Sequence, residues 1–580
     1  MRLRAEEAPG RRIYTFLRDG EEESASLTLA ELDMGARAVA AWLQGSEMRG
    51  ERALLLFPPG LPFITAFFGC LYAGAIAVPA YPPSPSRTQP RLRAVARDAR
   101  PRVVLTTSAL LQRAEALAVQ APELAEARWL AVDGPEAVAA GAWRPPDLGS
   151  DAVAFLQYTS GSTSSPKGVV VTHGNLLHNQ EMIRRAFGQD AESTIASWLP
   201  MYHDMGLIGG VLHPLYLGAS CVLMSPLSFL QRPSRWLRMV SRYGATASGG
   251  PNFAYELCLH RIGPEERAEL DLGSWRVAFN GAEPVRAETL ERFAAAFAGC
   301  GFRRVSFSPC YGLAEATLFV AGGGQGTPPR LYDADAGELE RGSLQPAMTA
   351  AVGAARRLVS CGSAWLGQEA IVVDPESRRR CAPGRVGEIW VSGPSVAQGY
   401  WNRPEETART FGARLADEPE AGPYLATGDL GCLLEGELYV TGRIKDLIIL
   451  RGRNLYPQDL ELTVESGSPE LRPGGAAAFT VEVEGEERLV VVAEVQRGVR
   501  PDAAALGAAV RHRLSDEHGV DLLELVLLAP GHLPKTSSGK VMRHACRAAY
   551  LSGEIAALGR SSDAGPRPGS AAVPAVDREA

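Results

Sequence analysis

The sequence predicts an α/β protein with largely parallel sheets. Short apolar runs rich in β-branched residues alternate with stretches whose apolar residues recur at helical spacing. Such alternation is typical of parallel sheets, because a helix usually connects two parallel strands. The longest apolar stretch, 66–81, is interrupted by two glycines and a proline and is shorter than the ~20 residues that a membrane-spanning helix needs. We therefore expect it to form a core helix that leads into a buried strand.

The individual elements follow this alternation along the chain. We expect strands at 52–57, 76–81, 101–107, 129–133 and 218–224, and helices at 29–44 and 91–99. The composition changes near 441–457, and the chain beyond it reads as a compact α+β unit. There we expect strands at 476–483, 488–495 and 524–530 and a helix near 502–518.

The length of 580 residues requires more than one core, since single hydrophobic cores stop growing at about 250–300 residues. We divide the chain into a large unit, 1–443, a hinge, 444–446, centred on Lys445, and a small C-terminal unit, 447–556. The tail, 557–580, is rich in Pro, Ser, Gly and Ala, and we expect it to be disordered.

Composition excludes several classes of protein. The net charge of −7 and the isoelectric point near 5.9 argue against a nucleic-acid partner, which would require a concentrated basic surface. The nine cysteines are scattered and contain no CxxC pair, so we expect neither a zinc site nor a disulfide framework. That usage and the absence of an N-terminal apolar signal segment favour a cytoplasmic protein without a membrane span.

The sharpest local signal is YTSGSTSSPKG at 158–168, followed by the strand-like VVVTH. A loop of hydroxyl residues and glycine before a lysine can present N–H groups, O–H groups and a cation to phosphate oxygens. It is not a Walker A loop, because Pro166 and Gly168 break that pattern. The alternative is a flexible Ser/Gly surface turn. The candidate phosphate-binding residues are Thr159, Ser160, Gly161, Ser162, Thr163 and Lys167.

This loop resembles that of the acyl-adenylate-forming superfamily, which includes acyl-CoA synthetases, luciferases and peptide-synthetase adenylation domains. The resemblance extends over about residues 25–550, with several motifs in the order of the family. It implies a large N-terminal domain of two αβ-layered sheets plus a distorted β-barrel. It also implies a small, mobile C-terminal domain that rotates over the large one as a lid between half-reactions.

Three further motifs match the nucleotide site of this superfamily. The resemblance implies that FNGAEP (279–284) and SPCYGLAEAT (308–317) flank the adenine and that Tyr311 stacks on it. Asp429, in YLATGDLG, would accept hydrogen bonds from both ribose hydroxyls, and Arg443 would contact the nucleotide. The remaining nucleotide-binding candidates in these motifs are Asn280, Gly281, Ala282, Glu283 and Gly312.

The resemblance also implies a metal ion and a catalytic lysine. Glu315 would bind Mg²⁺ together with the hydroxyl of Thr159, a hard oxygen donor set that Mg²⁺ prefers. An isolated Glu after a strand would otherwise be a solvated loop residue or a helix cap. Lys540, in PKTSSGK, matches the mobile lysine that reaches the α-phosphate and the substrate carboxylate when the lid closes. Without the resemblance, PKTSSGK is a flexible basic loop.

PMYHDMGLIGG (200–210) matches the motif at the junction of the acyl and nucleotide pockets. His203 would line the carboxylate site, although a lone histidine is more often a packed or surface residue. Met205, Gly206 and Gly209 are the other acyl-binding candidates, and glycines here would allow close approach to the backbone.

Several details resemble the fatty acyl-AMP ligase branch of the superfamily. The loop reads TSGSTSSPKG where CoA-forming enzymes typically have TSGTTGxPKG, and a segment at about 321–359 resembles the insertion characteristic of this branch. That insertion could instead be a neutral surface loop, since insertions in loops are tolerated.

The resemblance implies that the enzyme uses ATP to convert a fatty acid to its acyl-AMP. The acyl group then passes to the phosphopantetheine thiol of an acyl carrier protein acting in trans. A fatty acyl-CoA ligase, and a pseudoenzyme that only binds acyl ligand or nucleotide, remain as alternatives.

Overall fold

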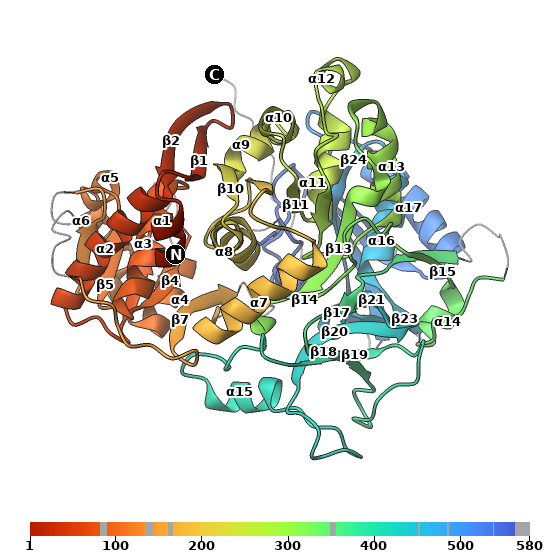
Figure 1. Ribbon diagram of the computed structural model, residues 1–580. Coiled ribbons are helices and arrows are strands. Elements are labelled where there is room, and N and C mark those ends of the chain that lie inside the picture. The colour runs from red at the N-terminus through yellow and green to blue at the C-terminus, as the bar shows by residue number, and fades with distance from the viewer. Residues whose placement is uncertain are drawn as a thin grey trace. The chain divides into compact units, whose positions relative to one another are not determined.

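The computed structural model describes residues 1–81, 90–134, 143–159, 166–348, 355–450, 453–483, 486–536 and 539–562. The chain divides into two compact units (Figure 1). The first consists of Met1–Met348 with Ala355–Thr441, and the main part of the second begins at Gly442. Each unit contains β-sheets accompanied by helices, which confirms the predicted mixed α/β class with large sheets in the N-terminal region.

A six-stranded sheet occupies the N-terminal part of the first unit, in the order β6-β5-β3-β4-β7-β8. Its strands are parallel except for β8, which pairs antiparallel with β7. The strands are β3 (Arg52–Leu55), β4 (Ile76–Pro79), β5 (Val103–Thr106), β6 (Arg128–Ala131), β7 (Val153–Thr159) and β8 (Lys167–Thr172). The accompanying helices are α1 (Arg2–Glu7), α2 (Leu29–Gly45), α3 (Leu61–Ala73), α4 (Pro90–Ala99), α5 (Ser108–Leu111), α6 (Ala114–Gln120) and α7 (His173–Ala186). The four strands and two helices predicted here are confirmed.

Local sequence explains where these elements begin and end. Thr28 caps α2 through a capping box with Glu31, in which each side chain bonds the other residue's backbone N–H. Helix α3 ends at Gly74, whose φ of +70° is the left-handed conformation that favours glycine at a helix terminus. The fully buried strand β4 follows directly, so the apolar stretch 66–81 forms the predicted core helix and buried strand.

A nine-stranded sheet forms the centre of the first unit, in the order β17-β14-β13-β12-β11-β9-β10-β1-β2. The strands from β13 to β1 are parallel, whereas β14, β17 and β2 run antiparallel to their neighbours. The strands are β1 (Arg12–Arg18), β2 (Glu22–Thr28), β9 (Thr194–Ser197), β10 (Ser220–Met224), β11 (Ala247–Gly250), β12 (Val277–Asn280), β13 (Phe307–Gly312), β14 (Phe319–Gly322) and β17 (Ser363–Ala364). The accompanying helices are α8 (His213–Leu217), α9 (Pro226–Gln231), α10 (Ser234–Tyr243), α11 (Asn252–Arg261), α12 (Pro264–Ala268) and α13 (Ala287–Phe297).

An aromatic cluster forms the core between this sheet and its helices. Trp236, Trp275, Tyr255 and Phe293 are fully buried. The ring centroids of Trp236 and Trp275 are 5.4 Å apart, and those of Tyr255 and Phe293 are 5.1 Å apart, both in edge-to-face geometry. Such pairs add to the stabilisation from apolar burial, so the sheet is a rigid base for the loops at its edge.

The rest of the first unit is antiparallel. A four-stranded sheet has the order β18-β19-β20-β21, and β15 pairs with β16. The elements are β15 (Leu331–Asp335), α14 (Ala336–Glu340), β16 (Ala355–Val359), β18 (Glu369–Val373), β19 (Gly387–Ser392), α15 (Pro404–Phe411), β20 (Leu425–Leu434) and β21 (Glu437–Arg443). The described strands of this region form the four-stranded sheet and the β15–β16 pair, and a closed β-barrel is not shown among them.

The second unit is built on a four-stranded sheet in the order β24-β25-β26-β27. Its elements are β22 (Ile448–Leu450), β23 (Arg453–Leu455), α16 (Pro457–Ser466), β24 (Leu471–Val483), β25 (Glu486–Val495), α17 (Ala503–His518), β26 (Leu522–Leu528), α18 (Arg543–Leu551) and β27 (Gly559–Ser562). The predicted strands and helix of this unit are confirmed as β24, β25, β26 and α17.

The C-terminal tail begins later than the sequence suggested. Residues 559–562, which we assigned to a disordered segment, form β27 and pair antiparallel with β26. Ser561 is buried there against Gly507. Polar composition concealed the strand, because backbone pairing with a neighbouring strand does not require apolar side chains. Residues 563–580 lie outside the described part of the chain.

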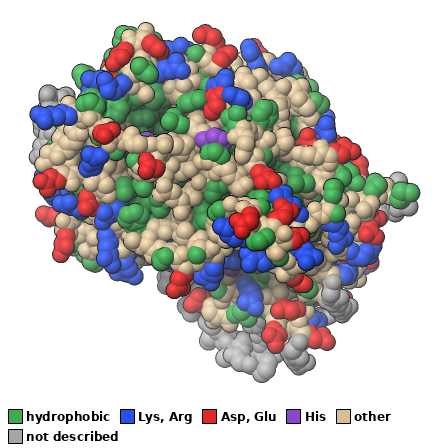
Figure 2. Space-filling model, turned by 60° about the horizontal axis from the view of Figure 1, so that its bottom comes forward, with side chains coloured by type: hydrophobic (Ala, Val, Ile, Leu, Met, Phe, Trp, Pro, Cys, Tyr) green, Lys and Arg blue, Asp and Glu red, His purple; other side chains and the backbone are tan. Residues whose placement is uncertain are grey.

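Acidic and basic side chains are interspersed on the face shown in Figure 2. Among the described residues of the whole chain, many acidic and basic side chains form ion pairs, such as Arg232 with Glu266 at 3.0 Å. Within the described ranges, no helix has the length and hydropathy required to span a bilayer.

Candidate active site

Two of the predicted motifs lie at one edge of the nine-stranded sheet. Strands β11, β12 and β13 are parallel, so their carboxyl ends meet at the same edge, the usual position of ligand sites in α/β sheets. Gly250 pairs with Asn280, and Asn280 with Pro309, which places Tyr311 two residues further along β13. The segments FNGAEP and SPCYGLAEAT therefore lie side by side, as the nucleotide-site prediction requires.

Close backbone packing explains the glycines in these motifs. A Cβ atom at Gly281 would lie 2.8 Å from the carbonyl oxygen of Cys310. A Cβ atom at Gly312 would lie 1.8 Å from the carbonyl oxygen of Leu318. Both distances are shorter than any allowed contact, so only glycine permits these two strand ends to adopt their conformation.

The turn after Asn280 is held by its acidic residue. Ala282 has a φ of +70°, an uncommon value for a residue other than glycine. The Glu283 carboxylate accepts a 2.6 Å hydrogen bond from the N–H of Phe253, near the start of α11. Glu283 thus fixes the turn, and Asn280 is completely buried beside it.

Tyr311 and Asp429 are joined by a hydrogen bond. The Tyr311 hydroxyl donates to Oδ2 of Asp429 at 2.7 Å, and both residues are buried. Asp429 lies on β20 directly after Gly428, whose φ is +73°, and its N–H donates to the hydroxyl of Thr427. Two predicted nucleotide-binding residues from different sheets therefore lie within one hydrogen bond of each other.

Glu315 is held by a residue that the sequence did not identify. It lies in the 3₁₀ turn Ala314–Ala316, and the Tyr400 hydroxyl donates a 2.9 Å hydrogen bond to its Oε1 atom. Burial and the negative charge of Glu315 raise the pKa of Tyr400 well above its usual range, so this hydroxyl keeps its proton. The carbonyl oxygen of Glu315 accepts a hydrogen bond from Ala397, which fixes the turn against the same segment.

The candidate phosphate loop is the turn of the β7–β8 hairpin. Thr159 and Lys167 face each other as the last pair of that ladder. Ser160, Gly161, Ser162 and Thr163, between these two strands, lie outside the residues that the structure describes. The hairpin nonetheless defines both ends of the loop.

Lys167 has two neighbours at the base of this loop. Its ammonium group forms an ion pair with Glu406 and lies 4.8 Å from the centre of the Tyr400 ring. The hydrogen bond from Lys167, more than any other contact, holds the pKa of Glu406 below its usual range. Tyr400 thus contacts both Lys167 and Glu315, two predicted site residues that lie 148 positions apart in the sequence.

Tyr400 and Glu406 are functional candidates that sequence reasoning missed. Their segment, GYWNRPEET at 399–407, has an aromatic pair after a glycine and a charged helix start. That composition is also typical of an ordinary surface turn, so it gave no specific signal.

The predicted acyl motif forms a short π-helix, Met205–Leu212. Such wide helical turns are rare and occur frequently at functional sites. A Cβ atom at Gly206 would lie 2.1 Å from the carbonyl oxygen of Pro200, whereas the nearest atom to a Cβ at Gly209 would be 3.9 Å away. Gly206 is therefore required by backbone packing, whereas a Cβ atom would fit at Gly209. Met205 is buried.

His203 lies immediately before this π-helix. Its Nδ1 atom is 2.5 Å from Oδ1 of Asp204, and the same carboxylate oxygen accepts a hydrogen bond from the N–H of Met205. His203 is half-buried, and the Asp204 contact fixes the orientation of its ring.

Lys540 and Arg443 belong to the second unit. Arg443 is exposed at the end of β21. Lys540 is half-buried in a hairpin-like loop, where its carbonyl oxygen accepts a 2.8 Å hydrogen bond from the N–H of Thr536.

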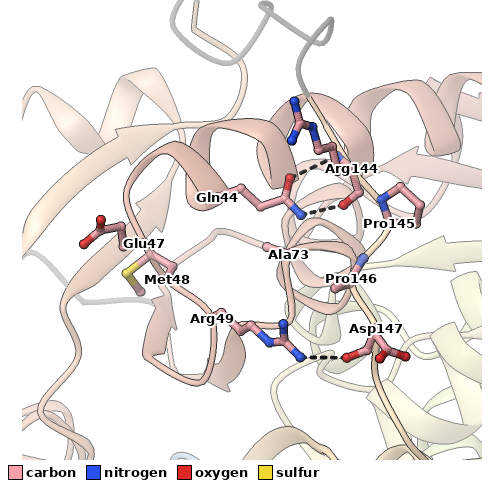
Figure 3. A pocket seen from close by; sticks show the side chains of 9 residues that line it. All are labelled: Gln44, Glu47, Met48, Arg49, Ala73, Arg144, Pro145, Pro146 and Asp147. Carbon is pink, nitrogen blue, oxygen red and sulfur yellow. Dashed lines mark hydrogen bonds between the residues drawn. The ribbon is translucent and has the colours of Figure 1, made fainter.

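A separate shallow cavity of about 250 Å³ lies in the first unit (Figure 3). Gln44 exchanges two hydrogen bonds with the backbone of Arg144, and Arg49 donates to the carbonyl oxygen of Asp147. These contacts fasten the segment 143–147 to the end of α2. No predicted site residue is among the nine residues that line this cavity.

Comparison with known families gives two matches. The AMP-binding enzyme family matches residues 1–401, and the AMP domain of the Disco-interacting protein 2-like family matches residues 445–559. Together they cover most of the chain.

Curated relatives of the protein include fatty acid ligases. The medium-chain-fatty-acid–[acyl-carrier-protein] ligase JamA of Moorena producens is 49% identical over 564 residues, which cover 96% of this chain and 95% of JamA. The long-chain-fatty-acid–AMP ligase FadD23 of Mycobacterium tuberculosis is 40% identical over 568 residues, with 95% of each chain covered.

Solved structures agree with these relatives. A fatty acyl-adenylate ligase from Legionella pneumophila, crystallised with acyl adenylate and pyrophosphate, is 43% identical with a TM-score of 0.74 and covers 97% of this chain and 96% of its own. A structure from a study of the fatty acyl-adenylate ligases of Escherichia coli and L. pneumophila has a TM-score of 0.84 at 34% identity, with 93% and 95% covered. The chain therefore belongs to the AMP-binding enzyme family, in its fatty acyl-AMP ligase branch.

Proposed function

We propose that the protein activates a fatty acid with ATP to form fatty acyl-AMP and pyrophosphate. It then transfers the acyl group to the phosphopantetheine thiol of an acyl carrier protein supplied in trans. The observation that carries this proposal is the double contact of Tyr400, whose hydroxyl binds Glu315 and whose ring lies against Lys167. Tyr400 thereby contacts both a carboxylate suited to binding a metal ion and a cation suited to binding phosphate.

The nucleotide would bind at the carboxyl edge of the nine-stranded sheet. Tyr311 would stack on the adenine, and Asp429 would accept hydrogen bonds from the ribose hydroxyls. The buried hydrogen bond between these two residues supports the assignment, since it orients both for one ligand. Asn280, Gly281, Ala282, Glu283 and Gly312 would complete the adenine pocket, and Arg443 would contact the nucleotide.

The phosphates would bind at the β7–β8 turn, with Thr159, Ser160, Gly161, Ser162, Thr163 and Lys167. The donor set there fits Mg²⁺, which typically takes one or two carboxylates plus phosphate oxygens and water. Glu315 and the hydroxyl of Thr159 would hold the ion, which would supply positive charge to the phosphate oxygens.

The first half-reaction forms the bond between the acid and AMP. An oxygen of the ionised carboxylate attacks the α-phosphorus, a new O–P bond forms, and the bond to the β-phosphate breaks to release pyrophosphate. Fatty acids are ionised at neutral pH, so the step needs no general base. Lys540 would neutralise the negative charge that accumulates as two anions meet, and His203 would line the carboxylate site beside Met205, Gly206 and Gly209.

The second half-reaction transfers the acyl group. The carrier thiol sulfur attacks the acyl carbonyl carbon, a C–S bond forms, and the C–O bond to AMP breaks. The thiol proton leaves to the surrounding water. The free state of all nine cysteines supports a reducing, cytoplasmic location for this chemistry.

Two structural elements would favour a carrier protein over CoA. Residues 444–446 would be the hinge about which the second unit moves as a lid. The predicted insertion, about 321–359, contains β15, α14 and β16 among its described residues. Arg357 forms one ion pair with Asp333 inside this segment and a second with Glu291 of α13, which anchors the segment to that helix. An element fixed in this way could restrict the lid movement that CoA-thioester formation requires.

Pyrophosphate–ATP exchange with fatty acids of about 4 to 18 carbons would test adenylate formation. We expect fatty acid-dependent exchange by the wild-type protein and a sharp loss in Lys540→Ala, with ATP binding largely intact. Unaltered exchange in that variant would overturn the role of Lys540. Absence of adenylate from every acid would favour the pseudoenzyme.

A second assay would identify the acceptor. Wild-type protein is given fatty acid and ATP with either CoA or a phosphopantetheinylated carrier protein, and the unmodified carrier, which lacks the thiol, is the control. We expect thioester on the modified carrier. CoA thioester formed at a comparable rate would favour the acyl-CoA ligase.

A further inference from the structure

Lys540 belongs to a hairpin in the second unit, of which the structure describes the paired segments 534–536 and 539–542. The N–H of Thr536 donates to the carbonyl oxygen of Lys540 at 2.8 Å, and the N–H of Lys540 donates back to the Thr536 hydroxyl at 3.0 Å. At the base of the hairpin, the N–H of Met542 donates to the carbonyl oxygen of Pro534 at 2.9 Å. The position of the Lys540 backbone therefore depends on where this base is fixed.

The entry to the hairpin is anchored by a buried carboxylate. Glu494, on β25, is 1% exposed. Its Oε1 atom accepts hydrogen bonds from the N–H groups of Gly531 at 2.8 Å and Leu533 at 2.9 Å. Its Oε2 atom forms an ion pair with Arg472 at 2.8 Å. Hydrogen bonds to an ionised acceptor are short and strong, so the carboxylate fixes the backbone at Leu533, the residue before Pro534.

The exit of the hairpin is anchored separately. Arg543, three residues after Lys540, makes two 2.7 Å hydrogen bonds to the carboxylate of Glu461 and a 3.0 Å ion pair with Asp446. Two independent ionic anchors thus hold the two ends of the hairpin. A change at Glu494 would release only the entry.

We propose that Glu494 is a positioning residue for adenylate formation, which acts by fixing the hairpin that carries Lys540. The inference rests on the proposed role of Lys540 at the α-phosphate. A buried charge is costly unless it is paired, and here the carboxylate is paired with Arg472 and with two backbone N–H groups of one loop. Glu494 does not itself touch the reactants.

Three variants would test the proposal. Glu494→Ala removes both anchoring bonds, and we expect fatty acid-dependent pyrophosphate–ATP exchange to fall about 100-fold, since a misplacement near 1 Å can cost that much. Glu494→Gln keeps an oxygen acceptor for both N–H groups and should lose less, about tenfold. Arg547→Met removes an exposed hydrogen bond to the carbonyl oxygen of Thr480 in the same unit and is the matched control, with exchange within about twofold of wild type.

Two readouts separate positioning from general stability. The equilibrium dissociation constant for ATP should not change, and acyl transfer from preformed acyl-AMP to a modified carrier protein should continue, because that step involves no attack at phosphorus. Hydrogen–deuterium exchange should increase in the peptide 531–542 while β24 and β26 stay protected. If hydrogen–deuterium exchange increased throughout the second unit, or if both half-reactions slowed together, the proposal would be overturned in favour of a structural role.

The double variant Glu494→Ala with Lys540→Ala gives the decisive comparison. If Glu494 acts through Lys540, the double variant should be no slower in exchange than Lys540→Ala alone. A further large loss would refute the inference. Normal exchange in Lys540→Ala would instead refute the role of Lys540, so the two failures are distinguishable.

Discussion

The hydroxyl of Tyr311 donates a 2.7 Å hydrogen bond to the carboxylate of Asp429, which lies 118 positions later in the chain. The two residues belong to different sheets, β13 and β20, and both are buried. This bond fixes the orientation of the carboxylate that we assign to the ribose and of the ring that we assign to the adenine.

Tyr311→Phe should therefore weaken ATP binding without affecting fatty acid binding. The ring remains, but Asp429 loses a donor, and a hydrogen bond to a charged group is worth ~1.5–3 kcal/mol. We expect the KM for ATP in pyrophosphate exchange to rise about tenfold, which corresponds to ~1.4 kcal/mol. Tyr243→Phe is the matched control, because it also removes a tyrosine–carboxylate bond, to Glu23, on the exposed surface. An unchanged KM for ATP in Tyr311→Phe would contradict the assignment.

Tyr400→Phe should weaken the response to Mg²⁺. The substitution keeps the ring beside Lys167 and removes the hydrogen bond to Glu315. Loss of a partner that orients a metal ligand typically costs about 10–100-fold in metal affinity. We expect the Mg²⁺ concentration for half-maximal exchange to rise about tenfold.

The control for this prediction is Tyr424→Phe, which removes a tyrosine–glutamate contact of 3.2 Å to Glu369 in the four-stranded sheet. If both variants raise the Mg²⁺ concentration for half-maximal exchange equally, the hydrogen bond from Tyr400 does not orient Glu315 for the metal ion.

The sequence allowed prediction of the elements and motifs but not of the contacts between them. Strands such as β3 and β4 can be predicted because the apolar run that identifies each of them consists of consecutive residues. The pairing of Tyr311 with Asp429 depends on where two sheets meet, which no local pattern records. Resemblance placed both residues in one nucleotide site, yet the hydrogen bond between them required the structure.

The residues that support the site were the least predictable. Glu494 occurs in VVVAEV, where a single acid on a strand ordinarily faces solvent, whereas here it is buried and binds the Lys540 hairpin. Tyr400 gave no signal because its two partners, Lys167 and Glu315, are remote in sequence. Supporting residues are defined by tertiary contacts, whereas a motif is defined by neighbours along the chain.

His213 should make the folded protein sensitive to acid. It is 2% exposed, with its ring nitrogens 2.6 Å from Oε1 of Gln180 and 3.0 Å from Oε1 of Gln189. Burial, followed by the charge of Arg184, lowers its pKa to about 3. The unfolded chain, with an ordinary histidine pKa near ~6.5, therefore binds this proton at a higher pH than the folded chain does.

The contribution of neutral His213 to the free energy of unfolding is complete above about pH 6.5. It declines as the pH falls toward 3, by at most ~1.4 kcal/mol per pH unit. Denaturant unfolding between pH 5 and 7 should show a smaller pH slope for His213→Gln than for wild type. His532→Gln, at an exposed histidine, is the control. Equal slopes in all three proteins would contradict the prediction.

Arg543→Met should destabilise the second unit more than a surface substitution does. It leaves the carboxylate of Glu461, whose side chain is 5% exposed, without its guanidinium partner. Breaking one half of a buried ion pair typically costs about 3–5 kcal/mol, because the remaining charge stays buried. We expect faster hydrogen exchange in β24, where the N–H of Ala478 donates to the same carboxylate.

Arg547→Met, which removes a surface hydrogen bond to the carbonyl oxygen of Thr480, is the matched control and should change exchange in β24 little. The double variant Arg543→Met with Glu461→Met removes both charges and should recover part of the lost stability, since apolar replacement of a buried pair is often tolerated. The recovery should be incomplete, because Ala478 loses its acceptor. A double variant as unstable as the sum of the two single changes would show that the two side chains are not energetically coupled.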